Sequence, residues 1–171
     1  MSRQTVRFGL LTALHSRYHM RDDCEFQVDC MDIDKIVDDF EFLDDWDDRY
    51  RYVIELGKAL PAFPEESRTE ENKVQGCVSQ VWLACSKTSV GDDMQLHYHG
   101  DSDAMIVKGL IAILLAFYSG KSAAEIVDMD PKTVFDRIGL KDHLTAQRSN
   151  GLNSMVRRVQ HDAANTLAPQ I

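Results

Sequence analysis

The chain has few of the residues that build disulfide-stabilised or zinc-ribbon proteins. It holds four cysteines and four prolines in 171 residues, and that is too few thiols for a disulfide scaffold of this length. No two cysteines form a CxxC pair, so a zinc ribbon and a thioredoxin-type motif are both absent. This cysteine usage favours a reducing compartment. The four thiols are Cys24, Cys30, Cys77 and Cys85.

Long apolar runs are also missing. The longest spans residues 110–118, which is far short of the roughly 20 residues that cross a bilayer, so it predicts a core helix. Residues 1–20 lack a long apolar stretch and a small-residue cleavage site, so no secretory signal is expected. The sequence contains no Ser/His/Asp motif, Gly-rich phosphate loop or HExxH, which argues against a hydrolase or a nucleotide enzyme.

A basic excess is absent too. The 19 Lys and Arg residues face 28 Asp and Glu residues, giving a net charge of −9, and this argues against a general nucleic-acid binder. The charge is uneven along the chain. Residues 1–21 carry +4 and no acid, residues 22–48 carry −12, and residues 49–171 carry −1.

This asymmetry predicts two parts, an N-terminal extension at 1–31 and one domain at 32–171. The extension has two interpretations. It is an organellar transit peptide, or it results from an upstream start, with the natural chain beginning at Met20 or Met31. A cytoplasmic location is expected unless residues 1–21 are a genuine transit peptide.

The hydrophobic pattern of the domain predicts an α+β fold, with a small antiparallel sheet packed by helices. Apolar residues spaced by three and four predict the helices, and a change to a period of two predicts two strands of a hairpin. The expected helices span 33–43, 45–60, 104–118, 123–129, 132–138 and 151–167. The expected strands span 78–87 and 94–99, joined by a turn at 88–93.

Cys77 is the first candidate for chemistry, because it lies between a polar loop and the first strand. Gly76 has no side chain, so a bulky partner could approach the thiol. Accessibility and thiolate character together set cysteine reactivity. The alternative is an inert buried cysteine, since free cysteines are commonly buried, and the sequence pattern alone leaves the two interpretations balanced.

Other polar residues have simpler interpretations. Cys85 has the same strand parity as apolar neighbours and is expected in the core. His97 and His99 share one strand face. With Cys77 or Cys85 they could complete a zinc site, although their alternation with apolar residues favours the solvent side.

The remaining polar residues are expected to have structural or surface roles. Asp101 and Asp103 are assigned as helix caps, and Arg148 as a surface residue or a fixed hydrogen-bond donor. Cys24 and Cys30 are expected to be incidental thiols.

Residues 32–168 resemble the SufE family of sulfur-acceptor proteins in iron–sulfur cluster assembly. The matching segments are YVIELGKAL at 52–60, NKVQGCVSQVW at 72–82, GDSDAMIVKGL at 100–110 and SNGLNSM at 149–155. The resemblance implies a sheet of about three strands, similar to the fold of the iron–sulfur scaffold proteins.

The resemblance also implies that Cys77 accepts sulfur from a cysteine desulfurase of the SufS or CsdA type, stimulates it, and passes the sulfur to a downstream scaffold. The pyridoxal phosphate (PLP) belongs to the desulfurase, so no resident cofactor is expected. Gly76, Ser79, Asp103 and Arg148 are expected to support the cysteine loop or engage the partner. Two alternatives stay open: a zinc- or iron–sulfur-binding scaffold using Cys77, Cys85, His97 and His99, and a stand-alone thiol enzyme such as a peroxidase.

Overall fold

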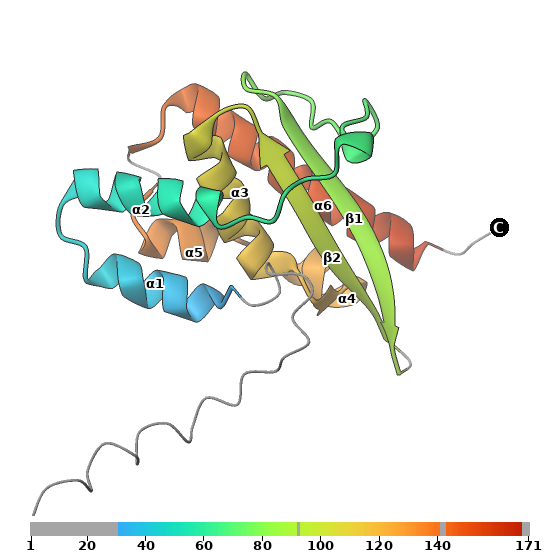
Figure 1. The fold of residues 1–171 in the computed structure, drawn as a ribbon. Coiled ribbons are helices and arrows are strands. Elements are labelled where there is room, and N and C mark those ends of the chain that lie inside the picture. Colours follow the sequence, from blue (N-terminus) through green and yellow to red (C-terminus); the bar gives the residue numbers. More distant parts are fainter. Residues whose placement is uncertain (1–30, 92, 141–142, 169–171) are drawn as a thin grey trace, which may run out of the picture.

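The computed structural model describes residues 31–91, 93–140 and 143–168 (Figure 1). Its larger helices are α1 (Ile33–Glu41), α2 (Trp46–Lys58), α3 (Met105–Tyr118) and α6 (Ala146–Leu167). Shorter ones are the 3-10 helix η2 (Glu65–Ser67), α4 (Ala123–Asp128) and α5 (Lys132–Arg137). The strands are β1 (Val81–Val90), β2 (Asp93–Ser102) and β3 (Lys121–Ser122). The predicted extension at 1–31 lies outside the described residues except for Met31.

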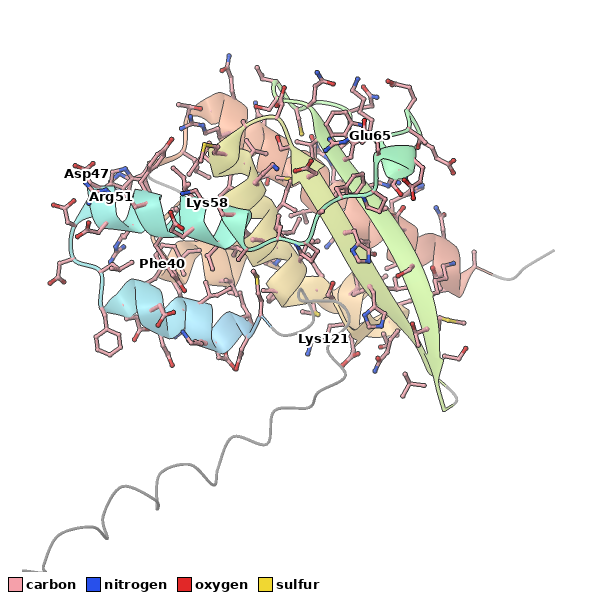
Figure 2. The ribbon with its side chains drawn as sticks, viewed as in Figure 1. Phe40, Asp47, Arg51, Lys58, Glu65 and Lys121 are labelled. Carbon is pink, nitrogen blue, oxygen red and sulfur yellow. The ribbon has the colours of Figure 1, made fainter. Side chains whose placement is uncertain are left out.

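The acid-rich start of the domain forms α1 and α2. The side chain of Asp32 caps α1 and that of Asp45 caps α2, each accepting a hydrogen bond from a backbone N–H two residues on. Further acids in the first turns suit the positive ends of the helix dipoles. Phe40 lies between the two helices (Figure 2), where its ring meets that of Tyr52 edge to face at 5.2 Å.

Helix α3 is the centre of the core, with the hairpin on one side and α1 and α2 on the other (Figure 1). It is buried over most of its length, as its apolar run predicts. Two glycines let α2 and α3 approach each other. A Cβ at Gly109 would stand 2.0 Å from the carbonyl oxygen of Val53, and one at Gly57 would stand 2.6 Å from the Gly109 nitrogen.

The sheet has three antiparallel strands in the order β1-β2-β3, which confirms the expected fold class. Leu83, Leu96 and Tyr98 point from it into the core. The turn predicted at 88–93 is wrong, because β1 continues to Val90 and pairs there with the first residue of β2. A tight connection at Gly91, whose φ is +63°, reverses the chain.

Helix α6 covers the sheet and completes the core. The hydroxyl of Tyr98 donates to the Val159 carbonyl at 3.2 Å and ties the two together. The helix begins at Ala146 rather than at the predicted 151, capped by the Thr145 side chain. Its first turn is polar, so apolar spacing does not reveal it. Within the described ranges, no helix is both long and apolar enough to span a membrane.

Candidate functional site

Cys77 lies in a loop that is closed at its base by backbone pairing. The Val74 N–H donates to the Val81 carbonyl at 2.9 Å, and the Leu83 N–H donates to the Asn72 carbonyl at 2.8 Å. The segment before the loop therefore runs antiparallel to the start of β1, and residues 75–80 form the connection. This arrangement presents the thiol to helix α6.

Gly76 lets the loop lie directly on α6. Its φ of +88° is a left-handed conformation that L side chains rarely adopt. A Cβ there would also stand 2.9 Å from the Ser154 hydroxyl oxygen. The backbone turn therefore requires glycine, and a side chain here would in addition force the Ser154 hydroxyl to move.

The Cys77 thiol is half-buried against α6. Its Sγ lies 3.6 Å from the Gly151 carbonyl oxygen, to which the S–H donates. Burial raises the pKa of this thiol above that of an exposed cysteine. In this conformation the side chain is therefore kept protonated and is a poor nucleophile, because the thiolate is the reactive species.

A cavity of about 280 Å³ opens beside the thiol. Its apolar walls come from α3 and α6, and its polar side comes from the start of α6 and from the loop itself. The apolar residues contributed by these two helices are Val107, Leu110, Leu152 and Met155. The others are Cys77, Val78, Ser79, Thr145, Gln147, Arg148 and Gly151. Ser79 and Arg148 thus lie around the same cavity as Cys77.

Asp103 fixes the far end of the cysteine loop. Its carboxylate accepts a hydrogen bond from the Gln80 N–H at 3.0 Å. The Gln80 carbonyl in turn accepts from the Ser102 hydroxyl at 2.7 Å and from the Asp103 N–H at 3.3 Å. The end of β2 therefore holds Gln80 firmly, while Cys77 rests on α6 by weaker contacts.

The helix caps predicted at Asp101 and Asp103 are wrong. Helix α3 starts after Ala104 without a side-chain cap. Asp101 is buried and forms ion pairs with Lys108 at 2.6 Å and with Arg68. The Arg68 guanidinium also lies 5.0 Å from the centre of the Trp82 ring. Both carboxylates therefore connect distant segments next to the loop, which local sequence cannot reveal.

Arg148 reaches the cavity from the first turn of α6. Its backbone N–H donates to the Thr145 hydroxyl at 3.4 Å, and within the described residues its guanidinium has no hydrogen-bond or ion-pair partner. Burial is the cause of the raised pKa of Cys77, so Arg148 does not activate the thiol in this conformation.

The structure does not assemble the alternative metal site. Cys85 pairs with Tyr98 across the hairpin, whereas His97 pairs with Ser86, so the Cys85 thiol and the His97 ring lie on opposite sheet faces. His99 shares the face of His97, and both rings are half-exposed. Among residues 31–91, 93–140 and 143–168, no group of three or more His, Cys, Asp or Glu side chains is arranged to hold a metal ion.

Two other predictions about cysteines have different outcomes. Cys85 packs against the core but stays partly exposed at its edge, so its expected core position is only approximate. Cys24 and Cys30 lie outside the described residues.

Sequence reasoning from single residues did not single out Gly151 and Ser154, on which the loop rests. Both belong to the 149–155 segment that carries part of the family resemblance. The available signal for Gly151 was a glycine at the first position of the predicted helix, where it lowers the helix propensity.

Comparison with known proteins identifies the family of this chain. Residues 34–163 match the SufE family model, described as an Fe-S metabolism associated domain. The chain belongs to the SufE family. An uncharacterized SufE-like protein of Rhizobium meliloti is 58% identical over 135 residues, which cover 79% of this chain and 96% of the relative. A second such protein, from Rhizobium etli, is 58% identical over 131 residues, 77% of this chain and 88% of the relative.

A solved structure supports the fold of this SufE family member. The solution structure of a hypothetical protein from Thermus thermophilus matches with a TM-score of 0.59 at 21% identity, covering 79% of this chain and 95% of that one. At that identity the match concerns the fold alone. The SufE domain associates the chain with iron–sulfur metabolism.

Proposed function

We propose that this protein accepts sulfur from a PLP-dependent cysteine desulfurase on Cys77, stimulates that enzyme, and passes the sulfur on for iron–sulfur cluster assembly. The observation that carries the proposal is one half-buried thiol at a loop tip, facing a cavity of about 280 Å³. Among the described residues no second thiol lines this cavity. A persulfide formed there has no resolving cysteine beside it within the described part of the chain.

The transfer is an exchange between sulfurs. The Cys77 thiolate attacks the outer sulfur of the desulfurase persulfide, forming a new S–S bond at Cys77. The S–S bond of the desulfurase breaks, and its electron pair leaves with the inner sulfur as a thiolate. That thiolate takes up the proton that Cys77 gave up, so no external oxidant or reductant is consumed.

The buried thiol must leave the helix before it can attack. Burial disfavours its thiolate, and the S–H is held by the Gly151 carbonyl oxygen. The proposal therefore includes a loop with two states, one docked on α6 with Gln80 held by Asp103, and one extended toward the desulfurase. Hydrogen exchange of residues 75–79 should rise when the desulfurase is added. Identical protection with and without the enzyme would refute the two-state loop.

The cavity suits the protection of the product. A persulfide exposed to solvent is lost to small thiols and oxidants, whereas a docked persulfide lies against the apolar walls of α3 and α6. Arg148 and Asp103 are proposed as partner-contacting and loop-holding residues, and Ser79 as a loop support. The reaction belongs in a reducing compartment, the cytoplasm if residues 1–21 are not a transit peptide.

Mass spectrometry tests the central claim. The full-length protein is incubated with a cysteine desulfurase and free cysteine, and the Cys77 peptide is examined for the mass of one added sulfur. The Cys77→Ser variant should not gain it at this position, and Cys85→Ser should load like the wild type. A wild-type Cys77 that gains no sulfur, while the desulfurase is active, would overturn the proposed function.

A further inference from the structure

Gly151 occupies a position where a helix would ordinarily favour another residue. It is buried within α6 (Ala146–Leu167), and glycine is the least favourable residue in a helix interior apart from proline. Its absent side chain faces Cys77. Setting aside chain neighbours and the backbone of α6, the atoms described within 4 Å of an added Cβ are Sγ of Cys77 at 3.5 Å and Cβ of Cys77 at 3.9 Å.

The resting thiol does not account for this glycine. A Cβ placed 3.5 Å from Sγ would make an ordinary van der Waals contact, so alanine fits opposite the thiol and would suit the helix better. The space has a use only when the sulfur carries an additional atom. In the proposed function that atom is the outer sulfur of a persulfide, on which this inference rests.

We infer that Gly151 is a positioning residue that keeps room on α6 for the outer sulfur of the Cys77 persulfide. An S–S bond is about 2.05 Å long. An outer sulfur turned toward α6 would therefore overlap a methyl group at 3.5 Å from Sγ, and glycine removes this obstacle at the edge of the cavity.

The Gly151 carbonyl gives the same position a polar role. It accepts the S–H of the resting thiol, with Sγ at 3.6 Å. In a persulfide the inner sulfur has no proton, so this hydrogen bond is lost on loading and the inner sulfur is no longer tied to the carbonyl. An outer sulfur lodged beside Gly151 meets the apolar side chains of Leu152 and Met155 around the cavity.

The test compares Gly151→Ala with the wild type, with Asn150→Ala as the matched control. Asn150 is the neighbouring exposed position on α6 and lies outside the cavity lining. Each full-length protein is loaded with desulfurase and cysteine, and separately with sodium polysulfide, which needs no docking. After removal of the donor, dithiothreitol is added and the loss of sulfur from the Cys77 peptide is followed by mass spectrometry. Dithiothreitol attacks the outer sulfur, frees the Cys77 thiol, then closes to its disulfide and releases hydrogen sulfide.

In Gly151→Ala the outer sulfur should be displaced toward solvent, so that it fails to load or is lost about fivefold faster than from the wild type. Alkylation of unloaded Cys77 should stay within about twofold, because a methyl group fits beside the thiol. The Tm should rise by about 2–4 °C from the better helix former. Asn150→Ala should keep the wild-type sulfur lifetime.

Each contrary result overturns the inference. Equal sulfur lifetimes in Gly151→Ala and wild type mean that the outer sulfur does not need the space left by the glycine. A lower Tm, or a rate of alkylation of unloaded Cys77 that rises as much as the rate of sulfur loss, means that alanine already disturbs the protein before any sulfur is bound. A wild-type protein that loads no sulfur from either donor contradicts the proposed function itself, so the two failures are distinguishable.

Discussion

The Asp103 carboxylate accepts a hydrogen bond from the backbone N–H of Gln80 at 3.0 Å and so holds the end of the loop that carries Cys77. The two residues lie in different connections, Gln80 directly before β1 and Asp103 between β2 and α3. The contact makes the docked position of the loop depend on a carboxylate distant in sequence from the cysteine.

Replacing Asp103 with alanine should loosen the loop. The lost hydrogen bond contributes about 1 kcal/mol to docking, so the extended population, and with it the alkylation rate of Cys77, should rise about fivefold. Iodoacetamide labelling quantified on the Cys77 peptide measures this. Asp103→Asn keeps an acceptor oxygen and should stay near the wild type. Equal rates in the two variants would contradict the role given to the carboxylate.

The reactivity of Cys77 should follow a pH profile displaced to higher pH. Burial raises the pKa of this thiol, so its thiolate fraction near neutral pH is smaller than that of an exposed cysteine, and alkylation should be slower in proportion. The rate should reach its midpoint at higher pH than in the urea-unfolded protein, which serves as the control. Added desulfurase should move the midpoint back down, and a folded profile that coincides with the unfolded one would contradict the buried thiol.

The buried Asp101 should make the fold sensitive to acid. Burial by itself raises the pKa of this carboxyl, but hydrogen bonds from Lys108 and Arg68 outweigh it and the pKa is lowered. A lowered folded pKa gives stability that is complete above the unfolded value and is lost as pH falls through the folded value. Asp101→Asn should therefore cost about 2 kcal/mol at neutral pH and much less in strong acid.

Urea unfolding of the wild type and Asp101→Asn at both pH values checks this. Glu66 is an exposed acid outside the ion pair, so Glu66→Gln is the matched control and should change little. A gap between the wild type and Asp101→Asn that stays constant with pH would show that the charge of Asp101 is not responsible.

A methyl group at Gly109 should disrupt the contact between α2 and α3. A Cβ there would stand 2.0 Å from the Val53 carbonyl oxygen, and backbone cannot yield as a flexible side chain can. Gly109→Ala should cost about 3 kcal/mol by overpacking, measured by urea unfolding. Gly151→Ala is the contrasting helix glycine with room for a methyl group. A neutral Gly109→Ala would show that α2 and α3 can separate freely.

The fold could be predicted where the sequence pattern is local. The apolar spacing around Phe40 predicts α1, because a helix with one buried face repeats apolar residues at three and four positions. The run at 110–118 predicts α3, because a fully buried helix is apolar on all sides. The alternation at 94–99 predicts β2 for the same reason. The start of α6 could not be predicted in this way, since its exposed first turn carries no apolar stripe and depends on the Thr145 cap.

The candidate site was predictable only in part. Cys77, Gly76 and the segments of the resemblance could be identified from the sequence, but their arrangement could not. Asp101 and Asp103 look like helix caps because they precede a helix, and they serve instead as partners of Arg68, Lys108 and Gln80. Contacts across such sequence distances are created by the packing of β2, α3 and the loop.

The walls of the Cys77 cavity have a consequence for engineering. Leu110 and Met155 line it and are each only 1% exposed within the hydrophobic core. Enlarging the cavity at these positions to admit a bulkier cargo would leave voids in the core and lower stability. Redesign would have to work through Gln147, Arg148 and the loop. Selectivity for a small cargo is thereby tied to the integrity of the fold.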